Sequence, residues 1–278
     1  MAEVKAAAKS NASHSAGKPK NTNGFWINLG IVLLMVALGF IVFFVLLGSP
    51  SNFSDPEKKV PLNWMGNMYH AGFIIALLIS MLFITITFIL ERAFTIIKAK
   101  GKTNGAEFVR KVQYHLANKN VDAAISECDK QSGSVGNVLK AGLVKYREMT
   151  TNNELSTDQK VLSIQKEIEE AKALELPMLD KNLVFLSTIT SSATLLGLIG
   201  TVFGMIRAFA AMGTAGAPDP TALAIGISEA LWNTAMGIST SFVAMLAYNF
   251  FTTINDGINF SMDEGGFTLT QSFAANYK

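Results

Sequence analysis

Cysteine is almost absent from this sequence, and histidine is scarce. The 278 residues include one cysteine, Cys128, and three histidines. A single cysteine excludes an internal disulfide framework and every metal or redox motif that is built on cysteine pairs. His14, His70 and His115 are scattered, with no second ligand at helical spacing, which favours surface or interfacial positions over metal ligation. We therefore expect neither a metal site nor a cofactor.

Charge is also scarce. Only 16% of the residues are charged, 50% are hydrophobic, and the mean hydropathy is positive. This composition is typical of integral membrane proteins. The net charge of +2, without a clustered basic face, argues against a nucleic-acid partner. Nothing indicates an enzyme, since no nucleophile–base pair, phosphate loop or metal spacing is present.

Long apolar stretches predict an all-α polytopic membrane protein with four transmembrane helices. The first stretch, Phe25–Leu47, is long enough to span a bilayer, which takes about 20 residues. A cleaved signal peptide is the alternative, but the stretch is too long and lacks an A-x-A site, so an uncleaved helix is favoured. The second span covers 68–97. Residues 183–254 then form a transmembrane hairpin of two helices, joined by the Gly/Pro turn "GTAGAPDP".

The segments outside the spans are polar. Ser156 and Gln159 have the spacing of a helix-capping box within a charged helical region. The predicted segments are a disordered tail (1–24), a loop (48–67), a helical domain (98–182) and a short polar tail (255–278).

Lysine and arginine predict the orientation in the membrane. The N-terminal tail has Lys5, Lys9, Lys18 and Lys20 against one acid, and residues 98–111 are also rich in basic side chains. On the opposite side, the loop 48–67 has only two lysines, which two acids balance, and the turn of the hairpin has no lysine or arginine. Because cytoplasmic loops carry an excess of such residues, we expect both termini and the helical domain in the cytoplasm.

The stretch "LLGLIGTVFGMIRAF", Leu195–Phe209, combines high hydropathy with three glycines. Lipid offers no hydrophobic force that brings helices together, so small residues at helix contacts let the backbones approach. We expect this small-residue surface to pack neighbouring subunits; packing within one chain is the alternative. The predicted packing residues are Gly197, Gly200, Gly204 and Gly237.

Hydroxyl side chains repeat at seven-residue intervals in both helices of the hairpin. Seven residues are nearly two helical turns, so each set makes one polar stripe. Two such stripes could line a narrow, partly hydrated path; hydroxyls that bond their own helix carbonyls are the alternative. One stripe is Ser187, Thr194 and Thr201, and the other is Thr234, Ser241 and Tyr248.

Glu229 is an acid inside a predicted span, where charge is costly and points to a functional or paired role. Arg207 is its candidate partner; an Arg207–Glu229 or Arg207–Asp219 pair that only fastens the hairpin is the alternative. Aspartate is absent from all four predicted spans. If the protein serves a proton path, we expect a second polypeptide to supply the titrating group.

The hairpin resembles the paired-helix signature of the MotA/TolQ/ExbB proton channel family, with most similarity to the ExbB/TolQ branch. The resemblance covers about 68–252 and rests on "LLGLIGTVFGMIRAF" and "GISEALWNTAMGISTSFVAMLAYNFF". It implies an inner-membrane homopentamer that encloses ExbD- or TolR-like single-span partners, whose intramembrane aspartate carries the proton. It further implies that proton-motive force becomes work on the cell envelope through a TonB- or TolA-like protein. By matched position, Thr201 and Thr234 correspond to the family's pore threonines and Glu229 to its intramembrane acid.

The sequence departs from the family pattern at two places. Val243 stands where family members often have proline, and the span at 25–47 is additional to the usual three. The extra span moves the N-terminus inside, in agreement with the lysine distribution. A non-conducting membrane scaffold and a flagellar MotA-like stator subunit remain the alternative functions; a scaffold has no use for two aligned hydroxyl stripes.

Overall fold

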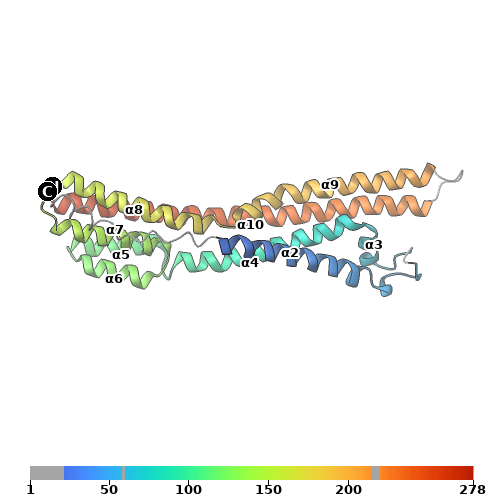
Figure 1. Cartoon of the computed structure of the whole chain (residues 1–278), viewed down its shortest axis with the longest axis horizontal. Coiled ribbons are helices and arrows are strands. Elements are labelled where there is room, and N and C mark those ends of the chain that lie inside the picture. Colours follow the sequence, from blue (N-terminus) through green and yellow to red (C-terminus); the bar gives the residue numbers. More distant parts are fainter. Residues whose placement is uncertain (1–21, 58–59, 214–219, 278) are drawn as a thin grey trace, which may run out of the picture.

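The computed structural model describes residues 22–57, 60–213 and 220–277, and its described elements are helices. The molecule is elongated, with the helical domain at one end and the paired membrane helices at the other (Figure 1). Most of the predicted N-terminal tail and Gly/Pro turn lies outside the described residues. We call the end of the membrane section next to the helical domain the domain end, and the opposite end the hairpin end.

Four described helices are long and apolar enough to cross a membrane, which confirms the all-helical, four-span prediction. The first is α2 (Thr22–Ile41), which continues as the π-helical segment η1 (Val42–Leu47). The others are α4 (Phe73–Lys100), α9 (Leu183–Gly213) and α10 (Pro220–Asn276). In Figure 1, α2 lies beside α4, and α9 lies beside α10.

The additional helix α2 packs against α4 through a close backbone approach. A Cβ atom at Gly39 would overlap Ser80 on α4. The Ser80 hydroxyl lies within 3.3 Å of the Val36 carbonyl oxygen of α2 and donates to the Ala76 carbonyl of its own helix at 2.7 Å. The extra span is thus part of the packed structure.

The second span begins later than the predicted residue 68. A short 3-10 turn η2 (Pro50–Asn52) and helix α3 (Trp64–His70) precede it. Gly72 then has φ of +76°, a left-handed conformation that side chains with a Cβ rarely adopt. The helical path therefore breaks at Gly72 and restarts at Phe73.

The helical domain consists of α5 (Gly105–Ala117), α6 (Val121–Gln131), α7 (Ser134–Thr151) and α8 (Thr157–Asp180). The predicted capping box is present, because the Ser156 hydroxyl accepts from the Gln159 N–H and the Gln159 side chain accepts from the Ser156 N–H. The buried core of the domain includes Leu139, Leu143 and Ile164.

The C-terminal segment is not the short tail that its polarity predicts. Helix α10 continues without a break to Asn276 and packs along α5, α7 and α8. Buried apolar residues recur on one face at helical spacing, and this periodicity was the signal in the sequence. These residues are Ile258, Met262, Leu269 and Phe273.

We expect Phe273→Ala to lower the free energy of unfolding by about 3 kcal/mol or more, since a fully buried aromatic side chain is removed. Phe273 is 0% exposed, whereas Phe267 on the same helix is 68% exposed. Phe267→Ala is therefore the matched control and should change stability by less than about 0.5 kcal/mol. Denaturant or thermal unfolding of the detergent-solubilised protein measures both. Equal losses for the two variants would contradict a C-terminal helix packed into the domain.

A buried polar cluster joins the membrane helices to the helical domain. Arg92 of α4 is 1% exposed and donates to the Leu179 carbonyl at 3.2 Å, near the C-terminal end of α8. Its neighbour Glu91 accepts from Arg92 and from Asn182, which directly precedes α9. Asn28 of α2 donates to the Asn182 side chain at 2.6 Å. These bonds fix the joint at which the domain meets the hairpin.

Candidate functional site

Close backbone contact holds the α9–α10 hairpin together within one chain. A Cβ atom at Gly204 would lie 2.7 Å from the Ala230 nitrogen and 2.8 Å from the Gly226 carbonyl oxygen, distances that no real Cβ tolerates. The predicted packing glycines therefore serve the hairpin itself, and the expectation that they pack neighbouring subunits is wrong for these positions. All four meet the facing helix this closely: Gly197, Gly204 and Gly237 against backbone atoms, and Gly200 against the Asn233 side chain.

Arg207 and Glu229 form an ion pair toward the hairpin end. The Arg207 Nη1 donates to both carboxylate oxygens, at 2.8 and 2.9 Å. The Glu229 side chain is 4% exposed, whereas that of Arg207 is 64% exposed. Gly72 lies against the pair, since a Cβ there would be 3.1 Å from Glu229 Oε1. Asp219, the alternative partner, lies outside the described residues. The pair thus fastens α9 to α10 beside the start of α4.

Asn233 extends this polar cluster and was not singled out from the sequence. It is 0% exposed, and its Nδ2 donates to the Ala71 carbonyl at 3.0 Å, which ties α10 to the turn between α3 and α4. The signal was available, because Asn233 stands four residues after Glu229 and so shares its helix face. Its Oδ1 is buried with no hydrogen-bond partner among the described residues.

The hydroxyl stripe of α9 lies on the accessible side of the helix. Ser187 and Thr194 are exposed, and Thr201 is partly exposed. The Thr201 hydroxyl donates to the Leu198 carbonyl of its own helix at 2.6 Å. This is the bond expected from the alternative that the hydroxyls serve their own helix. The Thr201 oxygen keeps a free lone pair, and rotation about χ1 would release its hydrogen.

The hydroxyl stripe of α10 lies in the contact with α9. Ser241 donates a short hydrogen bond to the Thr190 carbonyl of α9. Thr234 stands opposite Gly197, and its Oγ1 is buried with no partner among the described residues. Tyr248 is half-buried against the adjoining core. Only the first stripe therefore presents an open surface, whereas the second combines a helix–helix bond with an unpaired hydroxyl.

Polar oxygens without a partner recur along α10. Buried polar groups normally have a hydrogen-bond partner, so these exceptions are candidate places for water or for a group from another molecule. Among the described residues, six side chains of this helix have a buried oxygen with no bond: Asn233, Thr234, Thr240, Thr252, Asn255 and Asn259.

The two stripes meet at a cavity of about 400 Å³ near the domain end. Ser187 and Tyr248, the member of each stripe nearest the domain end, line it together with Thr252. Two carboxylates, Asp180 and Asp256, line the same cavity. These acids were not singled out from the sequence, because Asp180 precedes and Asp256 follows the predicted hairpin and neither lies within a span.

A metal centre is not indicated within the described ranges. No three His, Cys, Asp or Glu side chains come together there in a way that could hold an ion. Cys128 is buried, and burial raises the pKa of its thiol to about 12. The thiol is therefore protonated at neutral pH and is no nucleophile.

The sequence was compared with known protein families and proteins. Residues 131–264, from the end of α6 into α10, match the MotA/TolQ/ExbB proton channel family. The Tol-Pal system protein TolQ of Pseudomonas aeruginosa is 30% identical over 127 residues, which are 46% of this chain and 54% of that protein. The biopolymer transport protein ExbB of Xanthomonas campestris is 30% identical over 40% of this chain and 44% of its own length. The ExbB of Helicobacter pylori is 39% identical over 30% of this chain and 57% of its own. The chain thus spans about half the length of the curated relatives it matches.

Proposed function

Because this chain is a member of the MotA/TolQ/ExbB proton channel family, we propose that it is the multi-helix subunit of an ExbB- or TolQ-like motor. The motor resides in the bacterial inner membrane and converts proton-motive force into work on the cell envelope. The family is non-enzymatic, and the chain is not an enzyme.

The observation that carries this proposal is the row of unpaired polar oxygens on α10. An oxygen that is buried without a bond costs about 1 to 3 kcal/mol, so a helix that served only as a scaffold would gain by replacing these side chains with apolar ones. Water or a polar group of a second protein can satisfy them. Thr234 is the member of this row that also belongs to a hydroxyl stripe.

The partners follow from the same chemistry. Since the four predicted spans contain no aspartate, a second polypeptide supplies the titrating group. By resemblance to the family it is an ExbD- or TolR-like single-span protein, whose intramembrane aspartate meets Thr201 and, once its buried hydroxyl rotates outward, Thr234. A homopentamer of this chain, within membrane lipid, surrounds that partner. The protein that receives the force is TonB-like or TolA-like. The relatives named TolQ and ExbB each share 30% identity with this chain, so both remain alternatives.

Proton flux tests this function. The full chain is reconstituted into vesicles with an ExbD- or TolR-like protein, identified by a neighbouring gene for one N-terminal span with an aspartate. An imposed pH gradient should drive proton uptake that requires both proteins and is lost when the partner's aspartate is replaced by asparagine. Vesicles that remain proton-tight, with a complex that still supports envelope work in cells, would instead establish the scaffold function.

A flagellar MotA-like stator is the second candidate, because the chain has four candidate spans. Restoration of swimming in a stator-deficient strain, without restoration of TonB- or Tol-dependent functions, would favour it. The hairpin sequence, which resembles ExbB, predicts the opposite pattern.

We expect the N-terminus to be cytoplasmic. Cysteine placed at Ser13, in a Cys128→Ala background, should resist a membrane-impermeant thiol reagent in cells whose outer barrier has been opened. Cysteine at Ser51, an exposed residue of the loop after the first span, is the opposite-side control and should react readily. Labelling at position 13 as fast as at position 51 would overturn this topology.

A further inference from the structure

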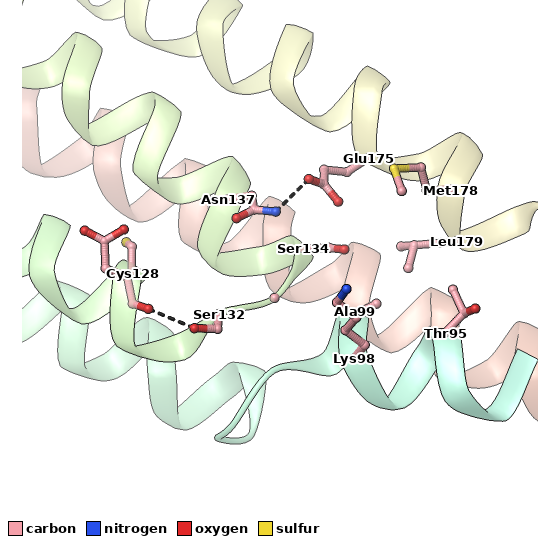
Figure 2. Close-up of a pocket in the computed structure, with 12 residues that line it drawn as sticks. Thr95, Lys98, Ala99, Cys128, Ser132, Ser134, Asn137, Glu175, Met178 and Leu179 are labelled. Atoms are coloured by element: carbon pink, nitrogen blue, oxygen red, sulfur yellow. Dashed lines mark hydrogen bonds between the residues drawn. The ribbon is translucent and has the colours of Figure 1, made fainter. Parts of the chain in front are cut away.

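A second cavity, of about 750 Å³, lies where the membrane section meets the helical domain (Figure 2). The last turns of α4 and α8 and the connection between α6 and α7 enclose it. Neither hydroxyl stripe reaches it, so the proposed proton path leaves it without a role.

The start of α7 lies at this cavity, which is lined by Gly133, Ser134 and Asn137, and the first N–H groups of the helix are unused. No side chain caps this helix. The N–H groups of Ser134, Val135 and Gly136 donate no hydrogen bond to any described residue. The N-terminus of a helix attracts anions through such groups and through the helix dipole.

Ser134 adds an independent donor. The residue is 6% exposed and lines the cavity, and its hydroxyl makes no hydrogen bond within the described part of the chain. Figure 2 shows this hydroxyl directed into the space between α7 and α8. A hydroxyl that faces a cavity and has no partner within the protein is free to donate to a bound group.

One basic and two acidic side chains line the cavity. Lys98, in the last turn of α4, lines the cavity and forms no ion pair among the described residues. From α8, Glu175 lines it as well and accepts from Asn137 at 2.9 Å. Asp129, the other acid of the lining, is paired with Lys140. The cavity therefore offers donors for one anionic group and a carboxylate for one cation.

The membrane-facing side of the cavity is apolar. Met178 of α8 lines it and is 63% exposed. On α4, next to the lining residue Thr95, Phe94 is 74% exposed. Ile97, one residue before Lys98, is 70% exposed. Acyl chains could follow this surface from the cavity into the bilayer.

We propose that this cavity binds the headgroup of a phospholipid that carries both a phosphate and an ammonium group, as phosphatidylethanolamine does. The phosphate accepts from Ser134, from the first N–H groups of α7 and from Lys98. The ammonium group pairs with Glu175. The bound lipid lies in the leaflet next to the helical domain and holds α4, α7 and α8 together at their common joint.

Native mass spectrometry of the delipidated full chain, titrated with dioctanoyl phosphatidylethanolamine, tests this site. We expect saturable binding that weakens about tenfold in Lys98→Gln, the size of one lost charge-assisted hydrogen bond, and about threefold in Ser134→Ala. Lys100→Gln and Ser163→Ala are the matched controls and should bind as the native chain does, since neither residue lines the cavity. Dioctanoyl phosphatidylglycerol, which lacks the ammonium group, should bind more weakly, and Glu175→Gln should remove that preference.

Two soluble probes identify the source of the phosphate. O-phosphoethanolamine and inorganic phosphate should each bind at least tenfold more weakly than the lipid, because they lack the acyl chains. Equal affinity for O-phosphoethanolamine would assign the site to a soluble metabolite and overturn the lipid proposal. Lipid binding that is unchanged in both Lys98→Gln and Ser134→Ala would overturn the site itself.

Discussion

The double variant Thr201→Val/Thr234→Val should assemble normally and lose most of its energy-dependent activity. Valine keeps the shape of threonine and removes the hydroxyl. A partner's carboxylate cannot stay charged in an apolar lumen without hydrogen-bond donors, because an unpaired buried charge is very costly. We expect proton flux to fall by at least about tenfold, since one or more hydrogen bonds to a charged group are lost.

Stability should change little in this variant, although activity is lost. Thr234 has a buried Oγ1 with no partner among the described residues, so its removal leaves no bond broken. Thr201 loses one local bond, to the Leu198 carbonyl. Thermal unfolding should therefore change by no more than a few degrees, while proton flux and envelope work collapse.

A matched double variant on another span controls for the loss of hydroxyls as such. Thr85 and Thr87 of α4 donate to carbonyls of their own helix, as Thr201 does. Thr85→Val/Thr87→Val should keep near-native activity. Serine at Thr201 or Thr234 should retain more activity than valine. If the Thr201/Thr234 double valine variant drives envelope work at the native rate, the hydroxyls serve only their own helices and the lining hypothesis fails.

Gly204→Leu should open the hairpin of each chain. The new side chain would have to enter a space where a Cβ alone meets the Ala230 nitrogen at 2.7 Å and the Gly226 oxygen at 2.8 Å. These are backbone atoms, so α9 and α10 must separate rather than let a side chain rotate away. We expect a loss of about 3 kcal/mol or more, at the upper end of the usual cost of overpacking.

Gly30→Leu is the matched control for this substitution. Gly30 lies in the membrane helix α2, and a Cβ there meets nothing within 4 Å. This variant should unfold as the native chain does. The comparison should be made in a detergent that dissociates the complex, because the structure assigns Gly204 to a contact within one chain. A Gly204→Leu variant that is destabilised only when assembled would return the glycine to an interface between subunits.

The sequence alone determined the features that depend on local pattern. Hydropathy over about 20 residues sets the number of spans, because a bilayer has one thickness. The capping box at Ser156 and Gln159 depends on residues three apart on one chain segment. The candidate partners Arg207 and Glu229 could be named because charged residues inside spans are rare and commonly pair with one another.

The tertiary structure alone decided which surfaces meet. A small-residue face can pack against its own hairpin or against another subunit with the same chemistry, so only the tertiary structure shows that Gly204 meets Ala230. Residues 255–277 appear polar on average, yet one face of them is buried because α5, α7 and α8 cover it. Likewise Arg92, which by its position near the end of a span belongs with the headgroups, is buried because the end of α8 brings it the Leu179 carbonyl. Periodicity reports what a face can bury, and the fold determines what covers it.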